Sequence, residues 1–363
     1  MLDPLYTLFG AILSWLYYVI GNYGLVIIFF SLAINSLLVP LRLKSQRNMI
    51  KQQFLQPALN DIKRHFANDP QRQQQESAAL MKRTGVSMGA GCLSSIIPLI
   101  IIWPIWRIIR APLQYVGQVS VENITKIAEF LVDKGLLGDN ILATVAQNDL
   151  PIINILKNNA SALTESVSQG WIRPDQLINT NFLGMDLGRV PSFNPLEWFG
   201  PNWRVELPLI ILPILTVVTM MLNMKMSRLN VLRKPPTKEE VERAKSNPAK
   251  AGQAQADPSE KTMKYMQYFM PVLMIFTVFT MPSAMGLYWV TSNLVFIAQS
   301  WISYEMYIKP ARAILAEEEG SVLLPQTAMG SDQTADLSQK GTAQSQKAAK
   351  KAGGKKKKKR GKG

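Results

Sequence analysis

The residues that could do chemistry in this chain are uncharged polar side chains at helical spacing inside long apolar stretches. One pair is four residues apart, a second group falls at i, i+3 and i+7, and a third shares one helix face. These residues are Ser31 and Asn35, then Thr216, Thr219 and Asn223, then Tyr288, Ser292, Gln299 and Ser303. Polar side chains that face lipid are costly, so we expect all three faces to turn inward. There they either bond to neighbouring helices or line a hydrophilic groove, and both alternatives stay open for any single residue.

Methionine side chains form a second pattern close to these polar faces. The chain holds 17 methionines, and several of them cluster in two apolar segments. The clustered residues that we select are Met220, Met221, Met224, Met270 and Met274. Flexible, polarisable methionine suits a surface that accepts many apolar sequences, so we predict a hydrophobic slide for substrate segments. Ordinary packing or lipid contact is the alternative explanation.

Catalytic and metal chemistry find no support in the sequence. The apolar segments hold no Asp, Glu, His or Lys in their interiors, and the chain contains neither a P-loop nor a GxGxxG sequence. Cys92 and His65 are the single cysteine and histidine, which excludes an intramolecular disulfide and a zinc site built from several such ligands. We therefore predict a protein that is not an enzyme and that uses no catalytic residue, cofactor or metal.

Five apolar segments are long enough to cross a membrane. The hydrocarbon core is about 30 Å thick and a helix rises about 1.5 Å per residue, so a span needs about 20 residues. The predicted spans are residues 23–41, 93–111, 206–224, 265–281 and 284–303. Residues 1–22 are apolar but shorter, and we expect a helix that lies on the membrane surface. The predicted fold class is an all-α membrane protein, a five-transmembrane-helix bundle with a cytoplasmic helical hairpin and an amphipathic N-terminal interfacial helix.

Loop charge orients these spans. Residues 42–92, 225–264 and 304–363 carry 9, 10 and 13 basic side chains against 3, 5 and 6 acidic ones, whereas residues 112–205 carry 6 against 9. Basic loops stay on the cytoplasmic side, which places residues 112–205 and the N-terminus outside and the C-terminus in the cytoplasm. The first residues lack the basic region of a signal peptide, so we interpret Met1 as the mature start of a bacterial plasma-membrane protein.

The three basic segments have different predicted structures. Residues 42–92 are expected to form a mobile hairpin with arms over 42–66 and 71–84, because Asn68-Asp69-Pro70 is a turn sequence. Residues 225–264 are predicted to be a solvated basic loop. Residues 304–363 end in GGKKKKKRGKG and form a predicted disordered tail, which could bind anionic lipid headgroups or ribosomal RNA.

Several sequence motifs resemble those of the YidC-type membrane protein insertases, a bacterial family with mitochondrial and chloroplast relatives. The hairpin carries LQPALNDIKRHFANDPQRQQQE, a later loop carries NFLGMDLG, and the final pair of spans reads MPVLMIFTVFTMPSAMGLYWVTSNL. The resemblance covers most of residues 5–305. It implies a groove that is open to the cytoplasm and to lipid but closed toward the outside. It also implies nascent membrane proteins as substrates and the Sec translocon as a partner.

Two features depart from the family pattern. Family members hold an arginine five residues before the proline of a PL motif in the first span, and Asn35 occupies that place before Pro40. Arg42 lies seven residues further along, on the same helix face, and we expect it to guard the groove mouth. The segment 112–205 is also long, and its VENITKIAEFLVDKG sequence looks helical, so we expect a small cap.

Two other functions fit parts of this pattern. A partner-dependent assembly factor for a translocon would need the same apolar contact surfaces, and the sequence does not separate it from an insertase. A small-solute transporter subunit would also line a path with polar residues. Transporters usually show repeated halves and broken helices at corresponding positions, which this sequence lacks.

Overall fold

The computed structural model describes residues 3–86, 100–232 and 258–315 and shows a mostly helical chain. Residues 1–310 form one compact unit, and the described part of the remainder, residues 311–315, is helical. Several predictions fall on other residues and so lie outside the described part. These are the start of the second span, most of the loop over 225–264 and the basic tail from residue 316 onward.

The first long helix joins the predicted first span and the first hairpin arm. Helix α2, Tyr23–His65, runs without a break through the predicted boundary at residue 41 and contains Pro40 and Pro57. The side-chain oxygen of Asn22 caps its start by accepting a hydrogen bond from the Leu25 N–H at 3.2 Å. Polar residues with good helix propensity follow Leu41, so nothing in this stretch ends the helix.

A short second helix completes the hairpin. Helix α3, Pro70–Arg83, begins with proline at its first position, and the Asp69 carboxylate accepts the Arg72 N–H at 3.0 Å. No residue of α3 is buried. The four residues 66–69 connect the two arms at the turn that the sequence indicates.

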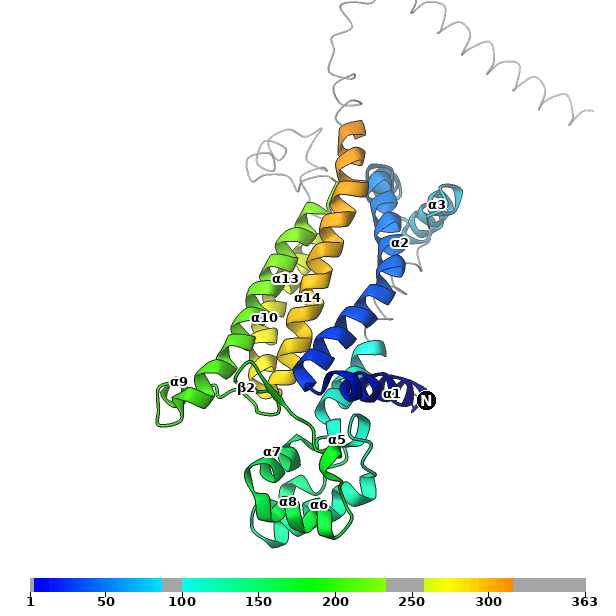
Figure 1. Ribbon diagram of the computed structural model, residues 1–363. Helices are drawn as coiled ribbons and strands as arrows, with labels where there is room; N and C mark the ends of the chain where they lie inside the picture. Colours follow the sequence, from blue (N-terminus) through cyan, green and yellow to red (C-terminus); the bar gives the residue numbers. More distant parts are fainter. Residues whose placement is uncertain (1–2, 87–99, 233–257, 316–363) are drawn as a thin grey trace, which may run out of the picture. The chain divides into compact units, whose positions relative to one another are not determined.

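Three further long helices form a bundle with α2. They are α10, Trp203–Leu229, α13, Pro258–Thr280, and α14, Ser283–Ser303, which a π-helical turn extends over Tyr304–Ile308. Helix α14 packs against α2 on one side and α10 on the other, and α13 packs mainly against α10 (Figure 1). Helices α10 and α13 extend beyond the predicted spans, α10 at both ends and α13 at its start. Residues 100–110 are also helical.

Among the described residues, two helices are both long and apolar enough to cross a membrane, α2 and α10. Helix α14 has no charged residue, but its many polar side chains lower its mean hydropathy. Helix α1, Asp3–Ile20, contains a shorter apolar stretch and lies beside the start of α2 (Figure 1). These helices support an all-α membrane protein, and the count of five spans stays a prediction.

Residues 112–189, here called the cap, form a small layer of short helices. One of them, α6, Val121–Asp133, confirms the helix expected from VENITKIAEFLVDKG. The cap core includes Ile124, Leu131 and Ile153, all fully buried. Its other elements are α5, Pro112–Tyr115, α7, Leu150–Asn158, α8, Ala160–Ser168, two short 3-10 turns, and the strands β1, Asn181–Phe182, and β2, Met185–Asp186.

A buried carboxyl fastens the cap to the end of the helix over residues 100–110. The Asp149 N–H donates to the Arg110 carbonyl at 3.1 Å. The Asp149 carboxyl accepts the N–H groups of Leu113 and Gln114 at 3.2 and 3.0 Å. Burial raises the pKa of this carboxyl to about 8, against the opposing effect of these two hydrogen bonds. Asp149 thus bonds to the Arg110 carbonyl and to the N–H groups of Leu113 and Gln114, and it fixes the turn between the helix and the cap.

Candidate functional site

The polar residues predicted in the first span meet helix α14. Asn35 is only 2% exposed, and its side-chain amide donates to the Ser292 hydroxyl at 3.1 Å and to the Ser31 carbonyl at 2.8 Å. Ser31 is buried and donates its hydroxyl to the Ile27 carbonyl at 2.6 Å. Asn35 and Ser292 touch directly, so the hydrated groove expected from the sequence stays a prediction.

Arg42 extends this contact by one positive charge. Its guanidinium donates to the Asn35 side-chain oxygen at 3.4 Å and lies 4.1 Å from the centre of the Phe296 ring. The side chain is half-buried, and within the described part of the chain it forms no ion pair with a carboxylate. The helix period places residues 35 and 42 on one face of α2, and the Arg42 side chain extends along this face toward Asn35.

Helix α14 supplies further polar groups to the same contact. Tyr288, Ser292 and Gln299 are buried and share one helix face. The Gln299 side-chain oxygen and the Ser303 hydroxyl have no hydrogen-bond partner among the residues that the structure describes. We call this contact the α2–α14 seam, which consists of Ser31, Asn35, Arg42, Tyr288, Ser292, Gln299 and Ser303.

The polar residues predicted in the third span lie at a different contact. Thr216 donates to the Leu212 carbonyl at 2.8 Å and approaches the Gly286 carbonyl of α14 at 3.3 Å. The Thr219 hydroxyl accepts the side-chain amide of Asn293 at 3.2 Å. A Cβ atom on Gly286 would lie 3.3 Å from the Leu212 Cβ, so the helices are packed closely here. We call this contact the α10–α14 interface.

Seven of the eight predicted groove residues lie at the two contacts of α14, five at the α2–α14 seam and two at the α10–α14 interface. Asn223 is half-buried, and we assign it to neither contact. Asn293, which the sequence analysis missed, belongs to the α10–α14 interface. Its spacing of seven residues from Gly286 is the signal that could have shown it, because both then lie on one helix face.

The predicted methionine slide is only partly covered by the structure. Met220, Met224 and Met274 are half-buried, and Met221 is exposed. The side chain of Met270 lies outside the described part. Exposure of this kind is compatible with contact to lipid as well as to a substrate.

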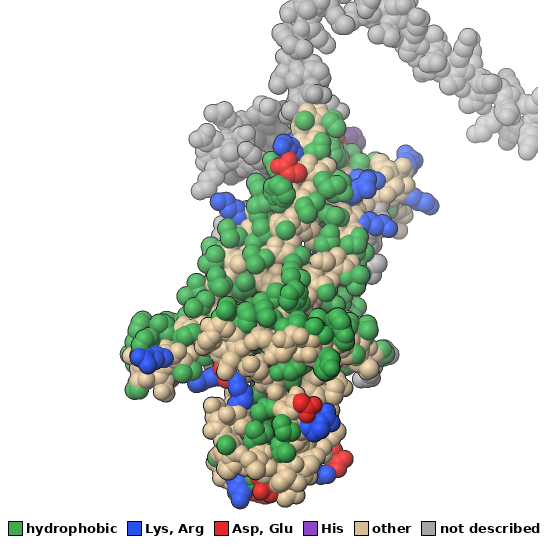
Figure 2. All heavy atoms as spheres, viewed as in Figure 1, with side chains coloured by type: hydrophobic (Ala, Val, Ile, Leu, Met, Phe, Trp, Pro, Cys, Tyr) green, Lys and Arg blue, Asp and Glu red, His purple; other side chains and the backbone are tan. Residues whose placement is uncertain are grey.

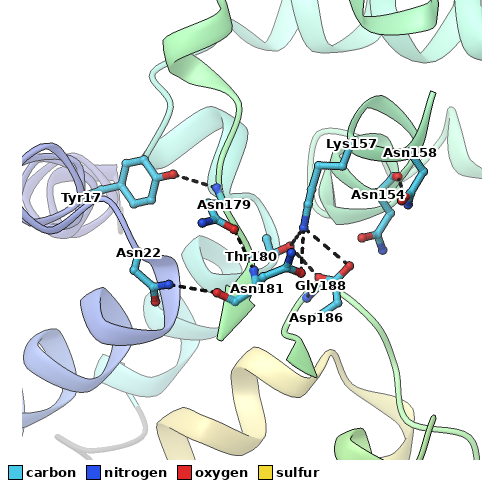
Figure 3. Close-up of polar contacts among 10 residues, drawn as sticks. All are labelled: Tyr17, Asn22, Asn154, Lys157, Asn158, Asn179, Thr180, Asn181, Asp186 and Gly188. Carbon is cyan, nitrogen blue, oxygen red and sulfur yellow. Dashed lines mark hydrogen bonds and ion pairs between the residues drawn. The ribbon is translucent and has the colours of Figure 1, made fainter. Parts of the chain in front are cut away.

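At the opposite end of the seam, the cap closes over the starts of the helices. The Tyr23 N–H donates to the Asn179 carbonyl at 3.2 Å, and the Asn22 amide donates to the Asn181 carbonyl at 2.9 Å (Figure 3). The Tyr17 hydroxyl of α1 accepts the Asn179 N–H at 2.7 Å. The segment before β1 therefore holds α1 and the start of α2 together.

Lys157 and Asp186 fix the hairpin of β1 and β2 within this closure. The Lys157 ammonium donates to the Thr180 hydroxyl at 2.8 Å and to the Asn181 side-chain oxygen at 3.2 Å, and lies 3.8 Å from the Asp186 carboxylate. The same carboxylate accepts the Thr180 hydroxyl at 2.6 Å and the Gly188 N–H at 3.0 Å (Figure 3). Both charged side chains are largely buried, so they are screened less than a surface pair.

The same hairpin reaches the other long helices. The N–H groups of Ser283 and Ala284, at the start of α14, donate to the carbonyls of Arg189 and Leu187 at 2.8 and 2.9 Å. Arg189 in turn pairs with Glu206 of α10 at 2.7 Å. Phe182 lies so close to Gly24 of α2 that a Cβ atom there would come within 2.3 Å of its ring. The NFLGMDLG motif and the Arg189 that follows it thus tie together the starts of α2, α10 and α14.

Comparison with known proteins decides which family this arrangement belongs to. Residues 15–310 match the family model described as 60Kd inner membrane protein. The chain belongs to this family. It is a membrane protein family, and the match spans α2, the cap, α10, α13 and α14.

Curated relatives named "Membrane protein insertase YidC" confirm the predicted family resemblance. The protein of Clostridium tetani is 40% identical over 124 residues, which is 34% of this chain and 52% of the relative. That of Caldanaerobacter subterraneus subsp. tengcongensis is 33% identical over 101 residues, 28% of this chain and 49% of the relative. That of Cereibacter sphaeroides is 24% identical over 302 residues, 82% of this chain and 35% of the relative. The chain spans about half the length of these relatives, or less.

Proposed function

We propose that the protein inserts other proteins into the membrane, acting on short polar tails and apolar segments of nascent membrane proteins. The observation that carries the proposal is the α2–α14 seam. There the Arg42 guanidinium contacts a buried amide and an aromatic ring and, among the described residues, no carboxylate. A positive charge held in this way is available to an acidic group of a passing chain.

The proposed mechanism needs no covalent step. A charged side chain at the centre of a bilayer costs about 2.5–3.5 kcal/mol on insertion scales. Opening the seam between α2 and α14 would expose Asn35, Ser292 and Gln299 to water and offer the substrate tail polar partners in place of lipid. The apolar segment of the substrate then leaves sideways into the bilayer, in contact with the predicted methionine slide.

Closure at the cap end supports a one-sided groove. Hydrogen bonds from the NFLGMDLG hairpin hold the starts of α2 and α14 together. The Gln299 oxygen, which has no partner in the described part of the chain, lies near the other end of α14. We therefore propose five spans, with the cap outside, the α2–α3 hairpin inside and the groove open to the cytoplasm. In a Cys92→Ser background, Glu129→Cys should react with an impermeant maleimide in intact cells and Gln75→Cys should not. The reverse pattern would refute this topology.

The proposed partners are nascent membrane proteins, the Sec translocon, membrane lipids and, through the basic C-terminal tail, the ribosome. The unbroken run Lys355–Arg360 is suited to phosphate groups. Deleting residues 355–363 should reduce co-sedimentation with ribosomes at low salt and have little effect at high salt. Unchanged binding at low salt would remove the tail from ribosome contact.

Reconstitution of the purified chain alone into liposomes tests the proposed function. The substrate is a single-span protein with an acidic tail, and protease protection of that tail measures its insertion. Arg42→Ala should lower the insertion rate by at least about tenfold, because a hydrogen bond to a charged group contributes about 1.5–3 kcal/mol. Lys44→Ala is the matched control, since Lys44 lies on the same helix and is exposed.

Two results would count against the proposal. Equal insertion by Arg42→Ala and Lys44→Ala proteins would show that Arg42 does not act on the substrate tail. No insertion above empty liposomes by the unmodified protein would favour a partner-dependent assembly factor instead.

A further inference from the structure

A second surface, outside the seam, exposes large apolar side chains. Residues 190–202, here called the lateral segment, connect the cap to α10 and contain the short helix α9, Pro195–Trp198. Phe193, Leu196 and Phe199 are 65%, 81% and 78% exposed. Soluble surfaces rarely expose several large apolar side chains next to one another. Such a patch marks a site of contact with a membrane or another protein.

The lateral segment is held in place by its own hydrogen bonds. The Trp198 indole N–H donates to the Ser192 carbonyl at 2.9 Å, and the Asn194 side-chain oxygen accepts the Leu196 N–H at 3.1 Å at the start of α9. The Phe193 ring packs edge-to-face against Phe279 of α13, with 5.0 Å between ring centres. The apolar side chains are therefore presented by a defined conformation that is anchored to the bundle.

The apolar surface of the lateral segment continues onto α10, and this continuity indicates what covers it. On α10 the exposed side chains of Ile211, Ile214 and Val218 are apolar, as expected of a helix flank that faces lipid. Figure 2 shows hydrophobic side chains continuing from the long helices onto the segment around α9, with basic side chains at its edge. The surface of the lateral segment is thus an extension of the flank that lies in the hydrocarbon region.

The residue types at the junction match a membrane–water boundary. Trp203 begins α10, and the Arg204 guanidinium lies 5.6 Å from the centre of its ring. Tryptophan concentrates at the headgroup level of a membrane. Arginine keeps its aliphatic stem against apolar surface while its guanidinium reaches the lipid phosphates. Helix α1 carries exposed Trp15 and Tyr18 and lies at the same end of the bundle, on another side of it in Figure 1.

We propose that the lateral segment is a membrane anchor that lies in the leaflet at the cap end, at the boundary between lipid headgroups and acyl chains. Phe193, Leu196 and Phe199 are the side chains that enter the lipid, and Arg204 meets the phosphate groups. With α1 on another side, the bundle is held at this end by two interfacial elements. The proposal requires α10 to cross the membrane and does not depend on the insertion activity.

Spin labels on the full-length protein in phosphatidylcholine–phosphatidylglycerol vesicles test this placement. In a Cys92→Ser background, a nitroxide is attached to Phe199→Cys, and collision with oxygen and with a water-soluble nickel chelate is measured. Oxygen concentrates in the acyl chains and the chelate in water, so their ratio reports the surroundings of the label. Ile214→Cys is the control for lipid, and Leu136→Cys, an exposed apolar position on the cap, is the control for water.

The expected oxygen-to-nickel ratio at Phe199 is several-fold above that at Leu136 and approaches that at Ile214. Leu196→Cys should give the same result, which guards against a distortion caused by one label. A ratio equal to that at Leu136 would place the segment in water and overturn the proposal. Low collision rates with both reagents would indicate cover by protein, either a second copy or another chain, and would also overturn it.

Discussion

The two faces of α14 differ in their polar residues, although side chains form hydrogen bonds across both contacts. On the α10 side, Thr216 and Thr219 donate their hydroxyls to carbonyls of their own helix, and Gly286 lets the helices approach closely. On the α2 side, side chains bond across the contact, one group carries a positive charge, and the Gln299 oxygen is left without a partner among the described residues. Both faces read alike in the sequence.

The difference indicates which contact is permanent and which one could open. Hydroxyls that are satisfied within one helix cost nothing further when packed against small residues, as at many helix contacts in membranes. An amide, a guanidinium and an unpartnered carbonyl are costly between dry helices, and water would satisfy all three. We therefore expect α10 and α14 to move together while α2 separates from α14.

The largest effect should follow a second charge at the seam. Asn35→Arg places a guanidinium in a buried position beside Arg42, and a central charge costs about 2.5–3.5 kcal/mol on insertion scales. The free energy of unfolding in mixed detergent micelles should fall by a comparable amount. The double variant Asn35→Arg, Arg42→Asn has one charge again and should recover the part of this loss that comes from repulsion between the two guanidinium groups. No recovery would mean that Arg42 and residue 35 do not interact.

The next effect tests whether the α10–α14 interface is permanent. Gly286→Leu forces a side chain against Leu212 and should lower the free energy of unfolding by about 1–3 kcal/mol, the usual cost of overpacking. Gly286→Ala, which adds only the tight Cβ contact, should cost less. If both variants unfold as the unmodified protein does, the contact is looser than its distances indicate.

Gln299 is proposed to bind the substrate in the open seam, so it should be dispensable for stability. Gln299→Leu removes a buried unpartnered acceptor and should leave the free energy of unfolding unchanged or raise it by about 1 kcal/mol. Insertion in the liposome assay should become slower, because the opened seam loses a polar partner. A stable variant with full insertion activity would exclude Gln299 from the path.

The smallest effect belongs to the hydroxyl of the permanent contact. Thr216→Val keeps the shape and removes a hydrogen bond, which in membrane helices is worth about 0.6 kcal/mol on average. Insertion should be unaffected. Ser292→Ala is the matched change on the α2 side and should slow insertion at a similar cost in stability. Equal insertion by the two variants would remove the functional distinction between the two faces.

The sequence allowed the helices and their polar faces to be predicted because both depend on local periodicity. The start of α2 at Tyr23 agrees with the start of the first apolar stretch, the turn before α3 follows from Asp69 and Pro70, and the buried faces of α14 follow from the spacing of Tyr288, Ser292 and Gln299. The continuity of α2 beyond residue 41 was not predicted. A change from apolar to charged residues marks the end of an apolar stretch and does not end a helix.

What the sequence determined by itself was the family, the location of polar residues on helix faces and the separation of basic from apolar segments. Only the tertiary structure decided which helix each face meets. It places Thr216 against Gly286 and Asn35 against Ser292, folds Arg42 back onto Asn35 and connects three helix starts through one β-hairpin. The helix period fixes the direction in which a side chain points, whereas its neighbour depends on how residues far apart in the chain pack together.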